Sequence, residues 1–261
     1  MSRMKKWYVL IATSFLSILL TGALASAQTS QVKTVWSGVY SAEQAARGKL
    51  EYAARCSRCH GASLEGTQNN GLVGKDFMER WREDNVGSLF EFVTNGMPPA
   101  QRGGGRPLIP VPEYLDILSF VFSQNDFPAG PKPLTTDGLD DIMIQYKDGP
   151  HPVPNGALVW IAGCMTGSGN SWTITGANDP LRTRSSDTKN YDEFHAAETQ
   201  ATGAQSYRLA NIGFVGNGFK PEEHSGEKLL VKGTLVRQMD SSMRINVVAV
   251  RKVADTCKTP R

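Results

Sequence analysis

Apolar residues in the first half of the chain recur every three or four positions, the spacing of helices that bury one face. Ser41 stands where an N-cap is expected, and Gln44 follows three residues later, as in a capping box. Pro112 suits the first turn of a later helix, because that position needs no amide hydrogen. The predicted helices cover residues 42–57, 75–82, 86–95 and 112–123. This region is therefore expected to be helical throughout.

The pattern changes after residue 156 to short runs of alternating apolar and polar residues bounded by glycine, which are typical of strands. Alternation is incomplete in the last two runs, as expected where a sheet bends. A short helix is expected over 221–228. The five predicted strands cover residues 157–164, 171–175, 206–212, 228–237 and 243–253.

Six prolines lie between Phe127 and Asn155, and such a run favours turns over regular elements. We therefore predict a proline-rich linker over 127–155, although residues 139–146 are apolar enough to pack on a neighbour. The chain is long enough for two modest domains. On this division they cover residues 36–126 and 156–261.

The first 27 residues have the three parts of a secretory signal peptide. These parts are a positive start (Arg3, Lys5, Lys6), an apolar core (7–20) and a small-residue cleavage site (Ala25-Ser26-Ala27). An uncleaved membrane anchor is the alternative, because the apolar run approaches the length of a membrane span. The cleavage site favours removal, so we predict a periplasmic protein with no membrane span after signal cleavage.

The net charge of +3 belongs to that leader. Its three basic residues are accompanied by no acidic residue, so the remainder of the chain is formally neutral. A formally neutral chain lacks the excess of lysine and arginine that is typical of a nucleic-acid-binding protein. We therefore expect protein partners that dock through local patches rather than through overall charge.

The sequence Cys56-Ser57-Arg58-Cys59-His60 has the spacing of a C-x-x-C-H site for covalent attachment of one c-type haem. The two thiols can join the haem vinyl groups, and the imidazole of His60 can bind the iron. Half of a zinc site is one alternative, but a second cysteine pair is missing from the sequence. A redox-active dithiol is another, but it favours a βαβ setting rather than a helical one.

The second iron ligand follows by elimination. Between residues 28 and 126, His60 is the only histidine, and the methionines are Met78 and Met97. Met78 lies in a segment that favours core packing. Two prolines follow Met97 and hold its loop extended, so Met97 is the expected axial ligand. Arg102 and Arg106, which flank a triple glycine, either pair with haem carboxylates or lie in a solvated loop.

Several of these features resemble a class I cytochrome c domain. They are Gly48 and Tyr52 in the first helix, the Cys56–His60 motif, the Asn95–Pro99 loop and residues 116–121 in the last helix. The resemblance implies an all-α fold in which the first helix packs on the last, with Phe120 as the aromatic partner. A carbonyl near Gly71 or Leu72 is expected to accept the Nδ1 proton of His60.

The five strands after residue 156 resemble an OB-like barrel in number and order. Cys164 ends the first predicted strand, and Cys257 follows the last. In an oxidising compartment, a disulfide between them is expected. The predicted fold class is therefore multidomain, an all-α class I cytochrome c domain followed by a mainly-β OB-like barrel.

Together these features predict a c-type cytochrome that carries one electron and is not itself an enzyme. Its iron would be held by His60 and Met97, and its partners would be redox proteins of the cell envelope. Two alternatives remain open. One is the haem subunit of a periplasmic dehydrogenase complex, which shares this mechanism. The other is a haem-based ligand-binding or sensing protein with a labile methionine.

Overall fold

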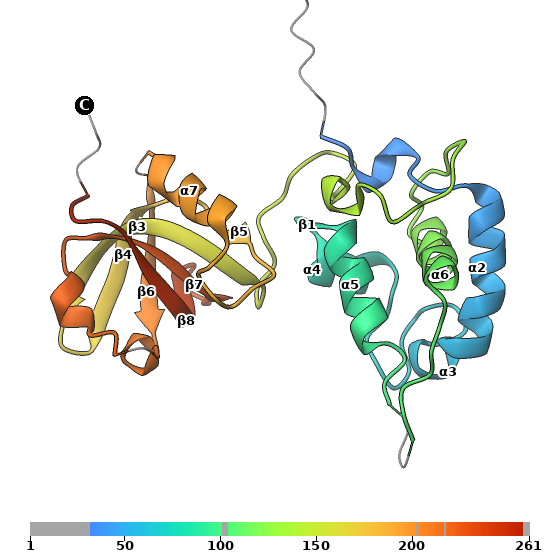
Figure 1. Cartoon of the computed structure of the whole chain (residues 1–261), viewed down its shortest axis with the longest axis horizontal. Coiled ribbons are helices and arrows are strands. Elements are labelled where there is room, and N and C mark those ends of the chain that lie inside the picture. The colour runs from blue at the N-terminus through green and yellow to red at the C-terminus, as the bar shows by residue number, and fades with distance from the viewer. Residues whose placement is uncertain (1–31, 101–103, 202, 217, 258–261) are drawn as a thin grey trace, which may run out of the picture. The chain divides into compact units, whose positions relative to one another are not determined.

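The computed structural model describes residues 32–100, 104–201, 203–216 and 218–257 (Figure 1). The predicted signal peptide, residues 1–27, lies outside them, and so does Arg102. Helices precede residue 142, and strands dominate after residue 157. The first group consists of η1 (Val35–Ser37), α2 (Ala42–Arg55), α3 (Ser57–His60), α4 (Gly74–Trp81), α5 (Val86–Gly96), α6 (Val111–Gln124) and η2 (Leu139–Asp141).

Helix α2 begins where the sequence places its cap, but the capping box is only half formed. The Ser41 side chain accepts a hydrogen bond from the Gln44 amide at 3.2 Å. The Gln44 side chain does not return the bond. It donates to the Leu134 carbonyl at 3.0 Å and accepts from the Leu134 amide at 2.6 Å. Because both Leu134 backbone groups are satisfied in this way, α2 fixes a segment 90 residues further along the chain.

Helices α2 and α6 approach each other closely at a glycine. A Cβ atom on Gly48 would lie 1.8 Å from the Asp116 carbonyl oxygen, so no larger residue fits there without displacement of the backbone. Beside this point, the Arg47 guanidinium donates to both carboxylate oxygens of Asp116, at 2.8 and 2.9 Å. The rings of Tyr52 and Phe120 pack with centroids 5.3 Å apart, which is the contact that the family resemblance implied.

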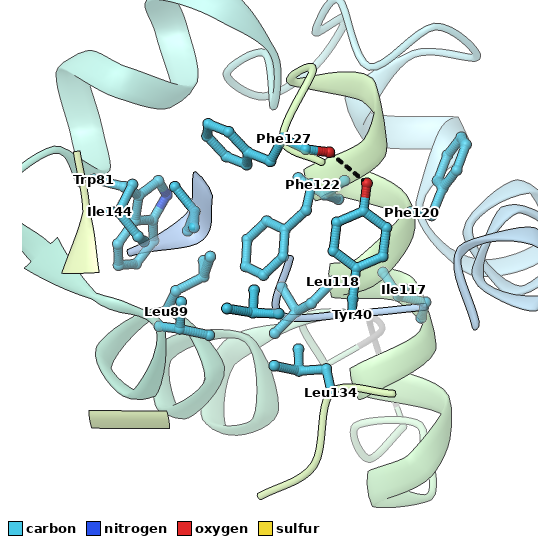
Figure 2. Packing of buried hydrophobic residues seen from close by; sticks show 14 of the residues in the cluster. Tyr40, Trp81, Leu89, Ile117, Leu118, Phe120, Phe122, Phe127, Leu134 and Ile144 are labelled. Atoms are coloured by element: carbon cyan, nitrogen blue, oxygen red, sulfur yellow. Dashed lines mark hydrogen bonds between the residues drawn. The ribbon is translucent and has the colours of Figure 1, made fainter. Parts of the chain in front are cut away.

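The segment expected as a linker contributes to the core of the helical region. Phe127, Leu134 and Leu139 are buried among the helices, and Tyr40 donates a hydrogen bond to the Phe127 carbonyl at 2.6 Å (Figure 2). Further along, β2 (Met143–Ile144) pairs antiparallel with β1 (Asp84–Asn85). The aliphatic side chains of this segment supply apolar surface that is removed from water.

The strands after residue 157 form one six-stranded sheet. They are β3 (Leu158–Ser168), β4 (Ser171–Ala177), β5 (Leu181–Arg182), β6 (Gln205–Ala210), β7 (Lys228–Arg237) and β8 (Met243–Ala254). The strand order is β4-β6-β8-β7-β3-β5, and β4 also pairs with β3. Strands β6 and β8 run parallel, whereas the other pairs are antiparallel, so the sheet is mixed. Short 3₁₀ turns, η3 (Ile212–Phe214) and η4 (Pro221–His224), connect the later strands.

One face of this sheet carries helix α7 (Tyr191–Thr199), which was not predicted (Figure 1). Lys232 of β7 is fully buried, and its ammonium group pairs with the Glu193 carboxylate of α7. The same ammonium donates to the Thr183 hydroxyl at 3.2 Å and to the Ser185 carbonyl at 3.1 Å. A buried cation with three oxygen partners fixes both α7 and the segment that precedes it.

A disulfide joins Cys164 of β3 to Cys257, which follows β8. Their Cα atoms lie 5.6 Å apart and are separated by 93 positions in the sequence. These are the two cysteines whose pairing the sequence led us to expect. The bond links the first long strand of the sheet to the end of the last.

The predicted fold class is wrong. Instead of an all-α domain followed by a separate OB-like barrel, the described residues form an α/β structure of helices and a six-stranded mixed sheet. Local patterns located most elements, but they did not show two long-range pairings. These are β1 with β2, which adds strands to the helical region, and β6 with β8, which makes the sheet mixed.

Candidate functional site at the Cys56–His60 motif

A largely apolar cavity of about 300 Å³ lies next to the motif. Cys56, Cys59, His60 and Met97 all line it, so the structure brings together the four side chains singled out in the sequence. They come from the end of α2, from α3 and from the residue that follows α5. The chain therefore places two thiols, one imidazole and one thioether around a single space.

The two thiols lie on a break between helices. Cys56 stands between the last residue of α2 and the first residue of α3, and its amide donates to the Tyr52 carbonyl at 2.8 Å. Both motif cysteines are unpaired, in contrast to the disulfide in the sheet. Burial raises the pKa of the Cys56 thiol to about 11. Reactive dithiols work with a lowered pKa, so this environment disfavours the redox-dithiol alternative.

His60 is oriented by one backbone carbonyl. Its Nδ1 atom lies 2.9 Å from the Asn70 carbonyl oxygen. Because a carbonyl can only accept, Nδ1 carries the proton, and the lone pair of the neutral ring is on Nε2. The acceptor belongs to the residue next to Gly71, and a carbonyl near Gly71 or Leu72 was expected from the sequence. Nε2 is therefore the atom of His60 available to a metal.

Met97 follows the last residue of α5, and its backbone is held by two hydrogen bonds. Its amide donates to the Val93 carbonyl at 2.9 Å, and its carbonyl accepts from the Tyr114 hydroxyl at 2.6 Å. The rival methionine, Met78, is buried in the hydrophobic core and does not line the cavity. Of these two methionines, Met97 is therefore the one placed near the motif.

The cavity walls are mainly aliphatic and aromatic. They are formed by Tyr52, Leu72, Phe77, Trp81, Leu89, Phe92, Val93, Pro98, Pro99, Ile109, Tyr114, Ile117, Leu118 and Val121, with a few polar residues and glycine between them. Trp81 is 7% exposed in the core and also borders the cavity. Its ring meets Phe92 edge-on, with centroids 5.5 Å apart. Such walls suit a large, flat, apolar group.

Arg106 leaves one buried donor without a partner among the described residues. One terminal nitrogen donates to the Thr94 carbonyl, whereas the other, Nη1, is buried and makes no hydrogen bond there. Thr94 follows Val93, which lines the cavity. Arg106 itself does not line the cavity, and the two roles weighed for it stay predictions.

Sequence reasoning missed one polar contact of this site. Tyr114 lies in a segment that was expected only as a helix, and its hydroxyl donates to the Met97 carbonyl. Spacing shows which face of a helix is buried, but not which carbonyl a buried phenol meets. Burial raises the pKa of Tyr114, so the hydroxyl keeps its proton and can donate.

Together, the residues of this site fit a covalently attached haem. The motif supplies two unpaired thiols and an imidazole with an available Nε2, while Met97 supplies a thioether. The apolar walls suit the ring of that group. A zinc site fits less well, because no group of three or more His, Cys, Asp or Glu side chains suited to a metal occurs in the described part of the chain.

No family model and no curated protein matches this chain. The resemblance to class I cytochrome c is therefore corrected. The all-α fold that it implied is replaced by helices with a mixed sheet, and no family match supports it. None of the helices in the described ranges is long and apolar enough to cross a membrane.

Proposed function

We propose that this chain is a periplasmic one-electron carrier with one covalently attached c-type haem. The single observation that carries this proposal is that Cys56, Cys59, His60 and Met97 line one largely apolar cavity. Three of them belong to one short motif, whereas Met97 lies 37 positions after His60 in the sequence. Their convergence supports a common ligand.

Each residue has a defined role in holding the group. The Cys56 and Cys59 thiols would add across two vinyl double bonds, so that each sulfur and its hydrogen end on carbon and no oxidant is needed. His60 would bind iron through Nε2, because Nδ1 is committed to the Asn70 carbonyl. Met97 would offer its sulfur as a second protein ligand to the iron. When bound, the haem supplies a couple between ferric and ferrous iron.

The surroundings indicate a comparatively high reduction potential. A thioether ligand favours ferrous over ferric iron, relative to a second histidine. The apolar walls act in the same direction, because they disfavour the more highly charged oxidised state. This combination suits an acceptor of electrons from a redox protein of the cell envelope.

Export supports the same proposal, since c-type haem is attached outside the cytoplasm. The leader-like sequence over residues 1–27 predicts export, and the Cys164–Cys257 disulfide is consistent with an oxidising compartment. A haem subunit of a periplasmic dehydrogenase complex would use the same four side chains. Copurification with a larger catalytic chain from native membranes or periplasm would favour that version.

The test is to produce the full chain in a bacterium that attaches c-type haem, and to record its visible spectrum and intact mass. We expect a coloured protein whose mass exceeds that of the processed chain by one haem and whose pigment stays with the protein in acidified acetone. The Cys56→Ser/Cys59→Ser variant should lose the covalent pigment. The matched control, Cys164→Ser/Cys257→Ser, should keep it, because those cysteines lie in the sheet. Colourless protein, or pigment that acidified acetone extracts, would overturn the proposal.

A further inference from the structure

The carbonyl of Met97 is bound by a hydroxyl from another helix. Tyr114 lies in the first turn of α6, is 5% exposed and donates to this carbonyl at 2.6 Å. Tyr114 and Met97 also line the same cavity. The hydroxyl therefore restrains the backbone of the residue proposed as the axial ligand, without touching the sulfur that would bind iron.

Helix α6, which carries Tyr114, is tightly packed against its neighbours. Nine consecutive residues of α6, from Tyr114 to Phe122, are buried. The close approach of Gly48 to Asp116 fixes the distance between α2 and α6, and the two bonds from Arg47 to Asp116 add to this. Movement of Tyr114 away from Met97 would disturb this packed interface, so the hydroxyl is pre-positioned.

The end of α5 is restrained at a second carbonyl. Arg106 donates to the Thr94 carbonyl, three residues before Met97. Thr94 and Met97 are thus both bound by side chains that follow them in sequence, Arg106 and Tyr114. Arg106 anchors the last turn of the helix, while Tyr114 anchors the first residue beyond it. Tyr114 therefore makes the contact that bears directly on Met97.

We infer that Tyr114 is a positioning residue that keeps the Met97 sulfur in place and so controls the access of small ligands to the sixth iron position. This inference rests on the proposed function. Removal of the Tyr114 hydroxyl leaves the Met97 sulfur present but makes the form in which this sulfur is held in place less stable relative to the form in which it is displaced. The site then exchanges its own ligand for an added one more easily, because added ligands bind in proportion to the fraction of open sites.

The test uses the full haem-loaded chain and the Tyr114→Phe variant. We expect the affinity of the ferric protein for imidazole to rise roughly fivefold, the factor that corresponds to one hydrogen bond of about 1 kcal/mol. Carbon monoxide should also bind the reduced variant faster than the wild type. The sulfur-to-iron absorption band should weaken without disappearing.

The chain offers a matched control in Tyr40→Phe. Tyr40 is 2% exposed and donates to a backbone carbonyl, that of Phe127, also at 2.6 Å, but it does not line the cavity (Figure 2). The two variants should lose similar stability in urea unfolding, because each loses one buried hydrogen bond. Only Tyr114→Phe should change imidazole affinity, carbon monoxide binding and the absorption band.

Three outcomes overturn the inference, and they are distinguishable. If the wild type carries covalent haem and shows the band, but both variants bind imidazole as the wild type does, Tyr114 has no positioning role and the proposed function stands. If the wild type carries covalent haem without the band, Met97 is not the ligand, and both the proposed ligation and this inference fail. An equal rise in imidazole affinity in the two variants indicates general loosening and also counts against a specific role.

Discussion

The Nδ1 atom of His60 lies 2.9 Å from the Asn70 carbonyl oxygen, so a backbone group fixes the tautomer and the orientation of this ring. Because the acceptor belongs to the backbone, it is controlled by neighbouring residues rather than by the Asn70 side chain. Gly71 follows Asn70 directly, so a side chain at this position would affect where the Asn70 carbonyl lies. A Cβ atom there would lie 2.8 Å from Asp76 Oδ2 and 3.1 Å from the Glu65 carbonyl oxygen.

The first prediction concerns Gly71→Val, which should displace the Asn70 carbonyl and weaken its bond to His60. A weaker bond makes the imidazole a poorer electron donor, which disfavours ferric iron, so the reduction potential should rise. Potentiometric titration of the haem-loaded protein measures this. Gly213→Val is the control, because no atom lies within 4 Å of the added Cβ. An unchanged potential in Gly71→Val would show that the carbonyl does not tune the site.

The second prediction concerns the thioether. Met97→Ala should abolish the sulfur-to-iron band, lower the reduction potential and allow fast carbon monoxide binding, because the second axial ligand is removed. Met78→Leu is the control. It conserves side-chain volume in the core, outside the cavity lining, and should cost less than about 1.5 kcal/mol of stability. Retention of the band in Met97→Ala would exclude Met97 as the ligand.

The third prediction concerns the thiol of Cys56 before haem attachment. Its pKa of about 11 in the folded chain leaves it protonated at neutral pH. Alkylation by iodoacetamide should therefore be slow at pH 7 and should accelerate as the pH rises toward 11. The Cys59→Ser variant, also without haem, isolates this signal, with urea-unfolded protein as the reference. Rapid reaction at neutral pH would contradict the burial of this thiol.

The same pKa shift makes the free energy of unfolding depend on pH. A raised pKa means that the folded state keeps a proton that the unfolded chain releases from its ordinary value of 9.0. The contribution of the protonated Cys56 thiol to the stability of the fold is therefore fully present below about pH 9. It is lost as the pH rises to about 11. Unfolding midpoints of the haem-free chain should fall more steeply across this interval than those of Cys56→Ala.

The fourth prediction concerns the contact between α2 and α6. Gly48→Ala places a methyl group against the Asp116 carbonyl and should force the helices apart. Overpacking of this kind typically costs about 1–3 kcal/mol, so the midpoint of urea unfolding should fall. Gly213→Ala, which adds the same methyl group in open space, should leave the midpoint nearly unchanged. Equal midpoints for the two variants would mean that the helices can separate without cost.

The fifth prediction concerns the buried ion pair of the sheet. Lys232→Met leaves the Glu193 carboxylate without its cation and should cost about 3–5 kcal/mol. The double variant Lys232→Met/Glu193→Leu should recover much of the loss, because no charge is left unpaired. Lys220→Met is the control. It removes an exposed pair with Glu223 and should change the stability little, because water and salt screen such a pair. A small effect of Lys232→Met on thermal unfolding would mean that the pair is dispensable.

Local sequence signals located several elements well. Strand β7 was predicted with both of its ends, and α2 begins at Ala42, directly after its predicted cap. These elements carry strong local information, namely apolar periodicity and capping residues. Helix α7 was missed, although Asn190 stands three residues before Glu193 and its side chain caps the helix. Its short, mostly polar sequence gives little periodicity to detect.

Long-range relationships were not readable in the same way. The pairing of Asp84–Asn85 with Met143–Ile144 joins residues about 60 positions apart, and neither strand is longer than two residues. The Tyr114 hydroxyl bond likewise depends on tertiary geometry, whereas a backbone acceptor for His60 was expected near Gly71 and is found at the adjacent Asn70. The motif cysteines and His60 were identified by spacing, and Met97 by elimination. Which carbonyl each polar group meets became visible only in three dimensions.

The bonds between Gln44 and Leu134 have a practical consequence for anyone who wishes to express a shortened version of this protein. Truncation after residue 126 would remove the layer of aliphatic side chains, Leu134 among them, that packs on the helices. It would also leave the buried Gln44 side chain without its backbone partners. Ile142 and Ile144 belong to that layer as well. The shortest version of the helical region that keeps this layer therefore ends beyond Tyr146, within the proline-rich segment 127–155.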